Sequence, residues 1–299
     1  MKTEPHRLRA RCVNQIGFLY AGVVMARRII VIGAVLFVLV VVGLAIPFIV
    51  EARRKSHVVT SQNNLRELAL FAAHHTKPDP KNDQRKLPTE IPAGTVAILD
   101  TPPEDRLSWV VGVLPGLDQR KVNSAQLLTA IDRTKPWGAD ANQKAARTRL
   151  VVLLCPENTP DVPPDAPAIT CYVGIGGVGT NAAALPFGTP KAGAMRYDTP
   201  TSFDRITDGL GQTLLFGETR NEFGPWLRGG YSTVRGFDDA PGAMPLVGVG
   251  GQFGGYFVAT ANFAMCDGGV RVFTSRVEPR VLYGLATIAG KETDPVPGD

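Results

Sequence analysis

The chain has 299 residues, of which 20% are charged and 44% are hydrophobic. It contains 32 glycines and 24 prolines, too many for a helical bundle or coiled coil and too few for a collagen-like or wholly disordered chain. With four cysteines in this length, it is not a disulfide-dense miniprotein either. The composition therefore predicts one or two globular domains rich in strands and turns.

The basic charge is confined to the N-terminal part of the chain. Residues 1–55 carry nine Lys and Arg against two Glu, whereas the whole chain has a net charge of +5, so residues 56–299 are left with −2. A nucleic-acid-binding domain needs a basic surface on the part that docks. Nucleic acid is therefore not expected as a partner.

Residues 29–50 form an apolar stretch of 22 residues without a charge. At about 1.5 Å per residue a helix of this length spans about 33 Å, enough for a bilayer core of about 30 Å. A cleaved signal peptide would have a shorter apolar core that ends in a small-x-small site, but this stretch ends in Pro47 and Glu51. We expect an uncleaved single-pass signal-anchor, with the lipid bilayer as its partner.

Basic residues flank the anchor unequally, with six before it and three after it. This bias favours a cytoplasmic N-terminus and an exported C-terminal part. We expect residues 1–28 to be a short basic cytoplasmic tail and the anchor to lie in the inner membrane. Met25 is an alternative start for such an anchor, so the true start stays open between Met1 and Met25.

The anchor helix is predicted to continue beyond the membrane as an amphipathic segment over residues 51–77. Val58, Leu65, Leu68 and Ala72 fall on one helical stripe. Pro78 ends this pattern, and Pro47 is expected to kink the helix near the membrane exit.

Residues 78–290 are predicted to be an exported β-rich domain, and residues 291–299 a disordered tail. The expected strands are residues 95–99, 107–114, 150–154, 170–175 and 213–218, with short helices over 123–133 and 142–149. Two Asp-Gly pairs are predicted turn formers: Asp208 with Gly209, and Asp267 with Gly268 inside a hairpin over residues 262–274.

The sequence contains no complete catalytic motif of the common kinds. The four histidines all lie within the first 75 residues, which argues against a Ser-His-Asp triad or a histidine metal site in the exported domain. Residues 174–179 match G-x-G-x-x-G, but Pro186 and Pro190 cut short the helix that a dinucleotide site needs. We expect no enzyme, no catalytic residues and no cofactor.

Acidic and sulfur side chains leave two alternatives open. One alternative is a calcium site, because calcium binds carboxylate oxygens in loops. Six aspartates lie near predicted turns, although they do not have EF-hand spacing. They are Asp198, Asp204, Asp208, Asp238, Asp239 and Asp267. Three cysteines lie in the exported part. They are either a Cys155–Cys171 disulfide with Cys266 left over, or three buried thiols.

Four aromatic side chains are candidates for stacking against a glycan or small solute: Trp109, Trp137, Trp226 and Tyr231. The alternative is that they are core residues. They carry the second functional hypothesis, a membrane-tethered binding module.

Several segments recur in the order known from one bacterial family, the prepilin-like exported proteins of domain-of-unknown-function family 1559. They are Asn63–Leu68, Leu107–Trp109, Leu114–Pro115, Pro136–Gln143, Leu154–Pro156, Tyr172–Gly174, Ile206–Gly209, Gly217–Glu218 and Ala261–Arg271. The chain resembles this family, formerly filed as solute-binding, over roughly residues 26–285. The resemblance implies an α+β fold in which a long pilin-like helix packs on an antiparallel sheet, with no established activity.

Two positions depart from the family pattern. Ile30 stands where prepilins carry a glutamate, and Phe257 stands ten residues before Asp267 where the family has its signature histidine. The predicted anchor, the lack of a catalytic motif and the family resemblance together lead us to expect a membrane-anchored, pseudopilin-like structural or interaction protein of the cell envelope. Its protein partners would be other envelope or secretion-system proteins.

Overall fold

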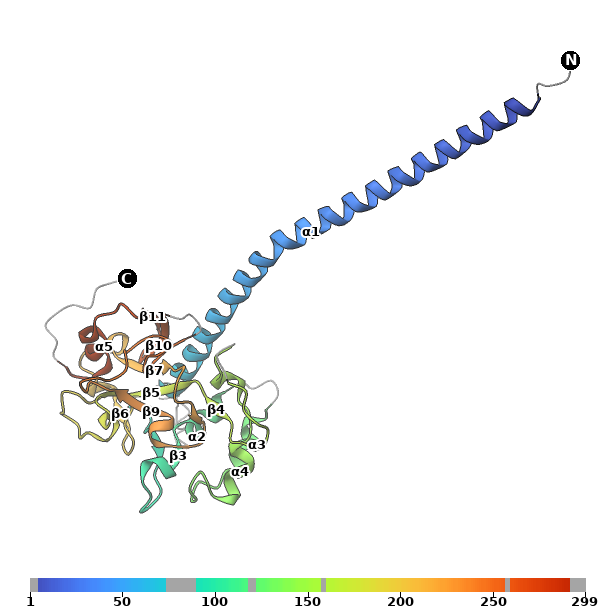
Figure 1. The fold of residues 1–299 in the computed structure, drawn as a ribbon. Helices are drawn as coiled ribbons and strands as arrows, with labels where there is room; N and C mark the ends of the chain where they lie inside the picture. The colour runs from blue at the N-terminus through green and yellow to red at the C-terminus, as the bar shows by residue number, and fades with distance from the viewer. Residues whose placement is uncertain (1–4, 74–89, 118–121, 157–159, 256–258, 291–299) are drawn as a thin grey trace, which may run out of the picture. The chain divides into compact units, whose positions relative to one another are not determined.

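The computed structural model describes residues 5–73, 90–117, 122–156, 160–255 and 259–290 (Figure 1). Side chains are described throughout these ranges except at residues 5–24, 26 and 29. The chain divides into two compact units, residues 1–56 and 57–299. The first helix, α1 (Pro5–Ala73), contributes to both.

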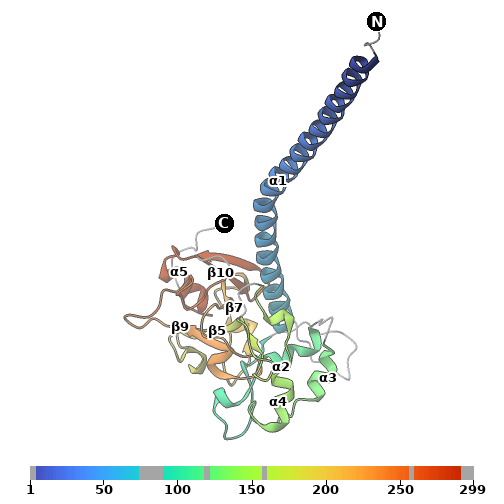
Figure 2. The same cartoon turned by 45° about the vertical axis from the view of Figure 1, so that its right-hand side comes forward.

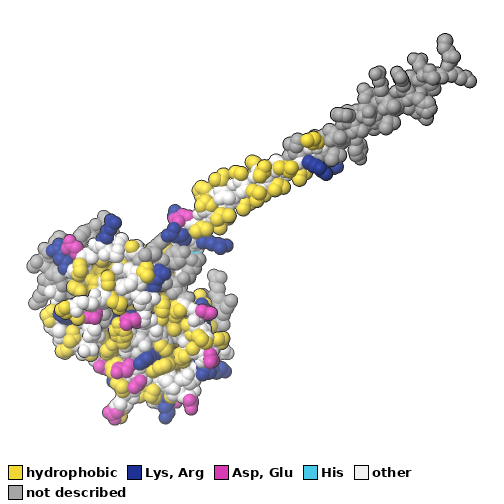
Figure 3. Space-filling view, viewed as in Figure 1, with side chains coloured by type: hydrophobic (Ala, Val, Ile, Leu, Met, Phe, Trp, Pro, Cys, Tyr) yellow, Lys and Arg dark blue, Asp and Glu magenta, His cyan; other side chains and the backbone are white. Residues whose placement is uncertain are grey.

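In the first unit, α1 carries a band of exposed apolar side chains. The large apolar side chains from Ile30 to Val50 are 47–78% exposed, and they form the yellow band along the helix in Figure 3. A helix in a soluble core would bury such side chains. Among the described residues, α1 is the one helix long and apolar enough to cross a membrane, and it continues without interruption past Pro47.

In the second unit, the last turns of α1 pack against the globular domain. Leu65, Leu68 and Ala72 are fully buried, as the helical stripe predicted, whereas Val58 is only half-buried. Ser61 lies on the same face because it precedes Leu65 by four residues, and it is also fully buried. This face therefore contains a buried hydroxyl among its apolar side chains.

The centre of the domain is a five-stranded sheet with the order β11-β10-β7-β5-β9. Its strands are β5 (Tyr172–Val178), β7 (Leu214–Glu218), β9 (Val234–Phe237), β10 (Thr260–Met265) and β11 (Val270–Thr274). β9 runs parallel to β5, and the other neighbours are antiparallel. The predicted α+β class, with a long helix and a mainly antiparallel sheet, is confirmed.

Each face of the sheet has its own apolar cluster. On one face, Phe216 and Ala264 belong to a cluster with Leu65 and Leu68 of α1. On the other face, Phe263 belongs to a cluster with residues of α5 (Pro279–Ala286). In both views the end of α1 and helix α5 lie on opposite sides of the sheet (Figures 1 and 2).

Short elements surround this sheet. The paired two-residue strands are β1 (Glu90–Ile91) with β6 (Thr201–Ser202), β2 (Thr95–Val96) with β3 (Leu107–Ser108), and β4 (Ile169–Thr170) with β8 (Gly224–Pro225). The short helices are α2 (Val110–Val113), α3 (Ser124–Thr129) and α4 (Asp140–Ala146). The 3₁₀ turns are η1 (Pro103–Asp105), η2 (Leu114–Gly116), η3 (Val151–Leu153), η4 (Ala182–Ala184), η5 (Phe203–Arg205), η6 (Leu210–Gln212) and η7 (Gly230–Ser232).

Two predicted strands are wrong. Residues 107–114 contain only the short β3 before the chain turns into α2, and residues 150–154 form the 3₁₀ turn η3. Both are short apolar runs that are largely buried. Such runs satisfy a buried strand and a buried helical turn equally well, because periodicity does not separate the two.

We predict that Leu68→Ala lowers the free energy of unfolding by about 2–5 kcal/mol, because it opens a cavity in the cluster between α1 and the sheet. Chemical denaturation of the full chain in detergent micelles measures this. Leu99→Ala is the matched control, since Leu99 is 88% exposed and its truncation should change stability by less than about 0.5 kcal/mol. Equal effects of the two changes would contradict the packing described above.

Candidate functional site

A row of three polar residues crosses three neighbouring strands on the sheet face that meets α1. Tyr172 of β5 pairs directly with Glu218 of β7. The register that pairs Phe263 with Gly217 sets Asn262 of β10 on the other side of Glu218. Since side chains alternate between the two faces of a strand, all three residues point toward the helix.

Glu218 is the centre of this row and is fully buried. One carboxylate oxygen, Oε1, accepts hydrogen bonds from Ser61 Oγ at 2.6 Å and Cys155 Sγ at 2.7 Å. The other, Oε2, accepts from Asn262 Nδ2 at 2.9 Å and the Asn262 backbone N–H at 3.2 Å. The carboxylate is thus held by four donors from α1, the loop after η3 and β10.

A chain of hydroxyl groups extends this network along the helix. The Ser61 hydroxyl donates to Glu218, so the Tyr172 hydroxyl, 3.0 Å from Ser61 Oγ, donates to Ser61. Asn64 Nδ2 in turn contacts the Tyr172 hydroxyl at 3.4 Å and the Leu154 carbonyl at 3.2 Å. Hydrogen bonds in such chains polarise one another, which strengthens each of them.

The surroundings of Glu218 keep its neighbours protonated. Burial raises the pKa of Tyr172 well above its ordinary value, and the nearby Glu218 charge raises it further. Burial also raises the pKa of Cys155, again with a contribution from Glu218. A thiol with a raised pKa is a poor nucleophile. The network is therefore suited to holding elements together rather than to attacking a substrate.

Close packing against the carboxylate leaves little room for anything else. A Cβ atom added at Gly255 would lie 2.3 Å from Glu218 Oε2, a distance that van der Waals radii forbid. Within the described ranges, no group of three or more His, Cys, Asp or Glu could hold a metal ion. The six loop aspartates considered for calcium form no such group.

The structure separates the four candidate stacking residues. Trp109 and Trp226 are only 2% and 0% exposed, and their indole N–H groups donate to the carbonyls of Thr233 and Thr148. The hypothesis that they offer a stacking surface is therefore wrong, because they are core residues. Trp137 is half-buried with Arg228 over its ring, and Tyr231 is 44% exposed with Arg235 over its ring.

The predicted turn residues lie at two separate places. Asp267 Oδ1 accepts a hydrogen bond from the Gly269 backbone at 2.8 Å in the β10–β11 hairpin, where Gly268 has φ +85°. Asp208 Oδ2 accepts from the Gly290 backbone at 2.9 Å, and Gly209 has φ +98°. Each pair therefore uses its glycine for a backbone conformation that other residues rarely adopt.

The side chains of Cys155, Cys171 and Cys266 are buried thiols in the structure. The Cys155 thiol donates a hydrogen bond to Glu218 Oε1. Formation of the Cys155–Cys171 disulfide in an oxidising compartment stays a prediction. Phe257, at the position of the signature histidine, lies outside the described residues.

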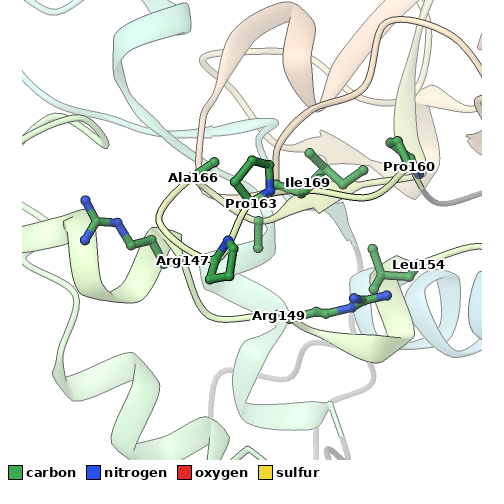
Figure 4. A pocket seen from close by; sticks show the side chains of 10 residues that line it. Arg147, Arg149, Leu154, Pro160, Pro163, Ala166 and Ile169 are labelled. Carbon is green, nitrogen blue, oxygen red and sulfur yellow. The ribbon is translucent and has the colours of Figure 1, made fainter.

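A cavity of about 220 Å³ opens beside a proline-rich segment, residues 160–164, and its walls are mainly apolar (Figure 4). Arg147 extends away from the prolines, whereas Arg149 extends toward Leu154. None of the four candidate aromatic residues lines this cavity. It therefore gives no support to a glycan site built on them.

Sequence reasoning did not single out the Glu218 network. Five of its members nevertheless lie in segments that carry the family resemblance. They are Asn64, Cys155, Tyr172, Glu218 and Asn262. The fully buried Ser61 is the exception, as it lies outside those segments.

The comparisons with known proteins give one match. A family model described as a protein of unknown function (DUF1559) matches residues 51–230, more than half of the chain. No curated protein and no solved structure shows significant similarity to the chain.

We predict that Glu218→Gln lowers the free energy of unfolding by about 2–4 kcal/mol, because the amide NH₂ replaces one acceptor oxygen and leaves buried donors facing a donor. Urea denaturation of the full chain in micelles measures the change. Glu278→Gln is the matched control, since its carboxylate is exposed and forms an ion pair with the exposed Arg280. A Glu218→Gln chain as stable as this control would contradict the role given to the network.

We also predict that stability falls as the pH rises above about 9. Cys155 and Cys266 have pKa values raised from an ordinary 9.0, and Tyr172 from an ordinary 10.0. These groups ionise in the unfolded chain first, so their contribution is complete below pH 9 and is lost as the pH rises. Each group contributes a slope of up to about 1.4 kcal/mol per pH unit. Denaturation curves from pH 7 to 11 test this, and an unfolding midpoint that stays constant to pH 11 would contradict it.

Proposed function

Because this chain belongs to the DUF1559 family of proteins of unknown function, we propose that it is a pseudopilin-like structural or interaction protein of the bacterial envelope that acts without catalysis. The family and the N-terminal apolar helix are consistent with a membrane-anchored exported protein. We further propose that the helix lies in the inner membrane, that the N-terminus is cytoplasmic, and that the partners are envelope or secretion-system proteins.

The observation that carries the proposal is the continuity of α1. One helix contains the exposed apolar band from Ile30 to Val50 and, further along, the buried face with Ser61, Leu65 and Leu68. The band suits a lipid environment, whereas the buried face ties the same helix to the sheet through Glu218. In this proposal, the helix that lies in the membrane is the same helix that packs against the sheet.

Basic residues lie at both ends of the apolar band. Arg27 and Arg28 precede it, and Arg53, Arg54 and Lys55 follow it. Basic side chains at both ends suit the two headgroup layers. The larger number of basic residues before the band, counted over the whole N-terminal segment, favours a cytoplasmic N-terminus.

The second candidate function, a tethered binding module for a glycan or solute, now rests on Trp137 and Tyr231 alone. Both are accessible, and each is covered on one face by an arginine. If the module binds a glycan through stacking, Tyr231→Ala should abolish retention on a glycan array. Unchanged retention would remove this candidate.

We predict that the full chain stays in the membrane fraction after carbonate extraction, and that Val38→Arg combined with Val42→Arg releases it. Each arginine near the middle of a membrane helix costs about 2.5–3.5 kcal/mol on insertion scales. Ser56→Arg, which adds a charge beyond the apolar band, is the control and should remain in the membrane. Recovery of the unaltered chain in the soluble fraction would contradict the proposal.

Protease protection of a C-terminal tag tests the orientation in the same cells. The tag should be digested once the outer membrane is permeabilised, while the inner membrane is still intact. A tag that is protected until the inner membrane is lysed would reverse the proposed orientation. The mass of the N-terminus from the same preparation distinguishes an uncleaved anchor, which we expect, from a processed one.

A further inference from the structure

Two arginine side chains converge on one aromatic ring, and none of the three residues belongs to the Glu218 network. The guanidinium carbons of Arg196 and Arg205 lie 4.0 Å and 4.2 Å from the ring centre of Phe187. An aromatic face attracts a cation, but two guanidinium groups on one ring also repel each other. An anion close to the two groups would offset this repulsion.

Arg196 lacks that negative charge at hydrogen-bond distance. Its side chain is buried, with 8% exposure, and its Nε and Nη1 atoms have no hydrogen-bond partner among the described residues. Burial lowers the pKa of Arg196, and the neighbouring charge of Arg205 lowers it further, against an opposing effect of Asp198. Buried donors without an acceptor indicate a missing partner, such as an ion or a water molecule.

Two carboxylates of this part of the domain already have partners. Asp198 forms an ion pair with Arg106 and is 59% exposed. Asp208 accepts the backbone N–H of Gly290. Neither side chain makes a salt bridge with Arg196 or Arg205 within the described part of the chain.

A cavity of about 200 Å³ lies beside Phe187 and Arg205, whereas Arg196 contacts the ring of Phe187 without lining the cavity. Its walls include Phe187, Thr189, Arg205 and Ile288, and no acidic residue lines it. The cavity has room for a small anion, with one guanidinium and one hydroxyl on its wall. Guanidinium groups form paired, charge-assisted hydrogen bonds with phosphate oxygens.

We propose that this cavity binds a phosphate group, with Arg205 as its direct ligand and Arg196 supplying a second positive charge from the same aromatic ring. A phosphate dianion matches the charge of the two arginines, whereas a single carboxylate does not. The site is independent of the membrane role, because all its residues belong to the folded unit from residue 57 onward.

Titration calorimetry of the full chain in micelles with inorganic phosphate, at constant ionic strength, tests the proposal. We expect saturable binding that Arg205→Gln weakens about tenfold or more, because a charge-assisted hydrogen bond is lost. Arg276→Gln removes an exposed arginine that lies outside this cavity, and it should leave the affinity unchanged. Absence of saturable binding, or equal affinity in the Arg205→Gln chain, would overturn the site.

Two further measurements separate the roles of the residues. Arg196→Gln removes the second positive charge, and we expect it to weaken phosphate binding several-fold while the chain keeps its far-ultraviolet circular dichroism. Unchanged affinity in this folded variant would remove Arg196 from the site. Acetate should bind more weakly than phosphate, and equal affinities would overturn the assignment to phosphate.

Discussion

The buried carboxylate of Glu218 is the interaction on which the arrangement of helix and sheet depends. A carboxylate without solvent is costly unless hydrogen bonds satisfy its oxygens. Here the four donors come from α1, β10 and the loop after η3. Displacing any one of these elements would leave a buried charge with an unfilled acceptor, so they are fixed relative to one another.

The apolar contacts around this network do not fix the helix to the same degree. Leu65, Leu68 and Ala72 bury surface against the sheet, but hydrophobic burial is not directional and tolerates a shift of the helix. The hydrogen bonds of Ser61 and Asn64 are directional. They specify one rotation of this end of α1 about its axis and one position along that axis relative to the sheet. The exposed apolar band belongs to the same helix, α1.

Much of this architecture was predictable from the sequence, for reasons that differ between elements. The apolar helix and the Leu65–Leu68–Ala72 stripe follow from composition and periodicity, and the β10–β11 hairpin follows from its alternating residues around Asp267 and Gly268. The turn at 151–153 was not predictable, because its apolar run fits strand and helix alike. The Glu218 network was hidden for another reason: its members are separated by up to 201 positions, and only the strand register brings them together.

A double-mutant cycle between Ser61→Ala and Glu218→Gln measures the helix–sheet connection most directly. The free energies of unfolding of the full chain, both single variants and the double variant are determined in the same micelles. Residues joined by a buried hydrogen bond should show a coupling energy of about 1–3 kcal/mol, so the double variant should be more stable than the sum of the single effects predicts. Strictly additive effects would show that Glu218 does not hold the helix, and would contradict the account.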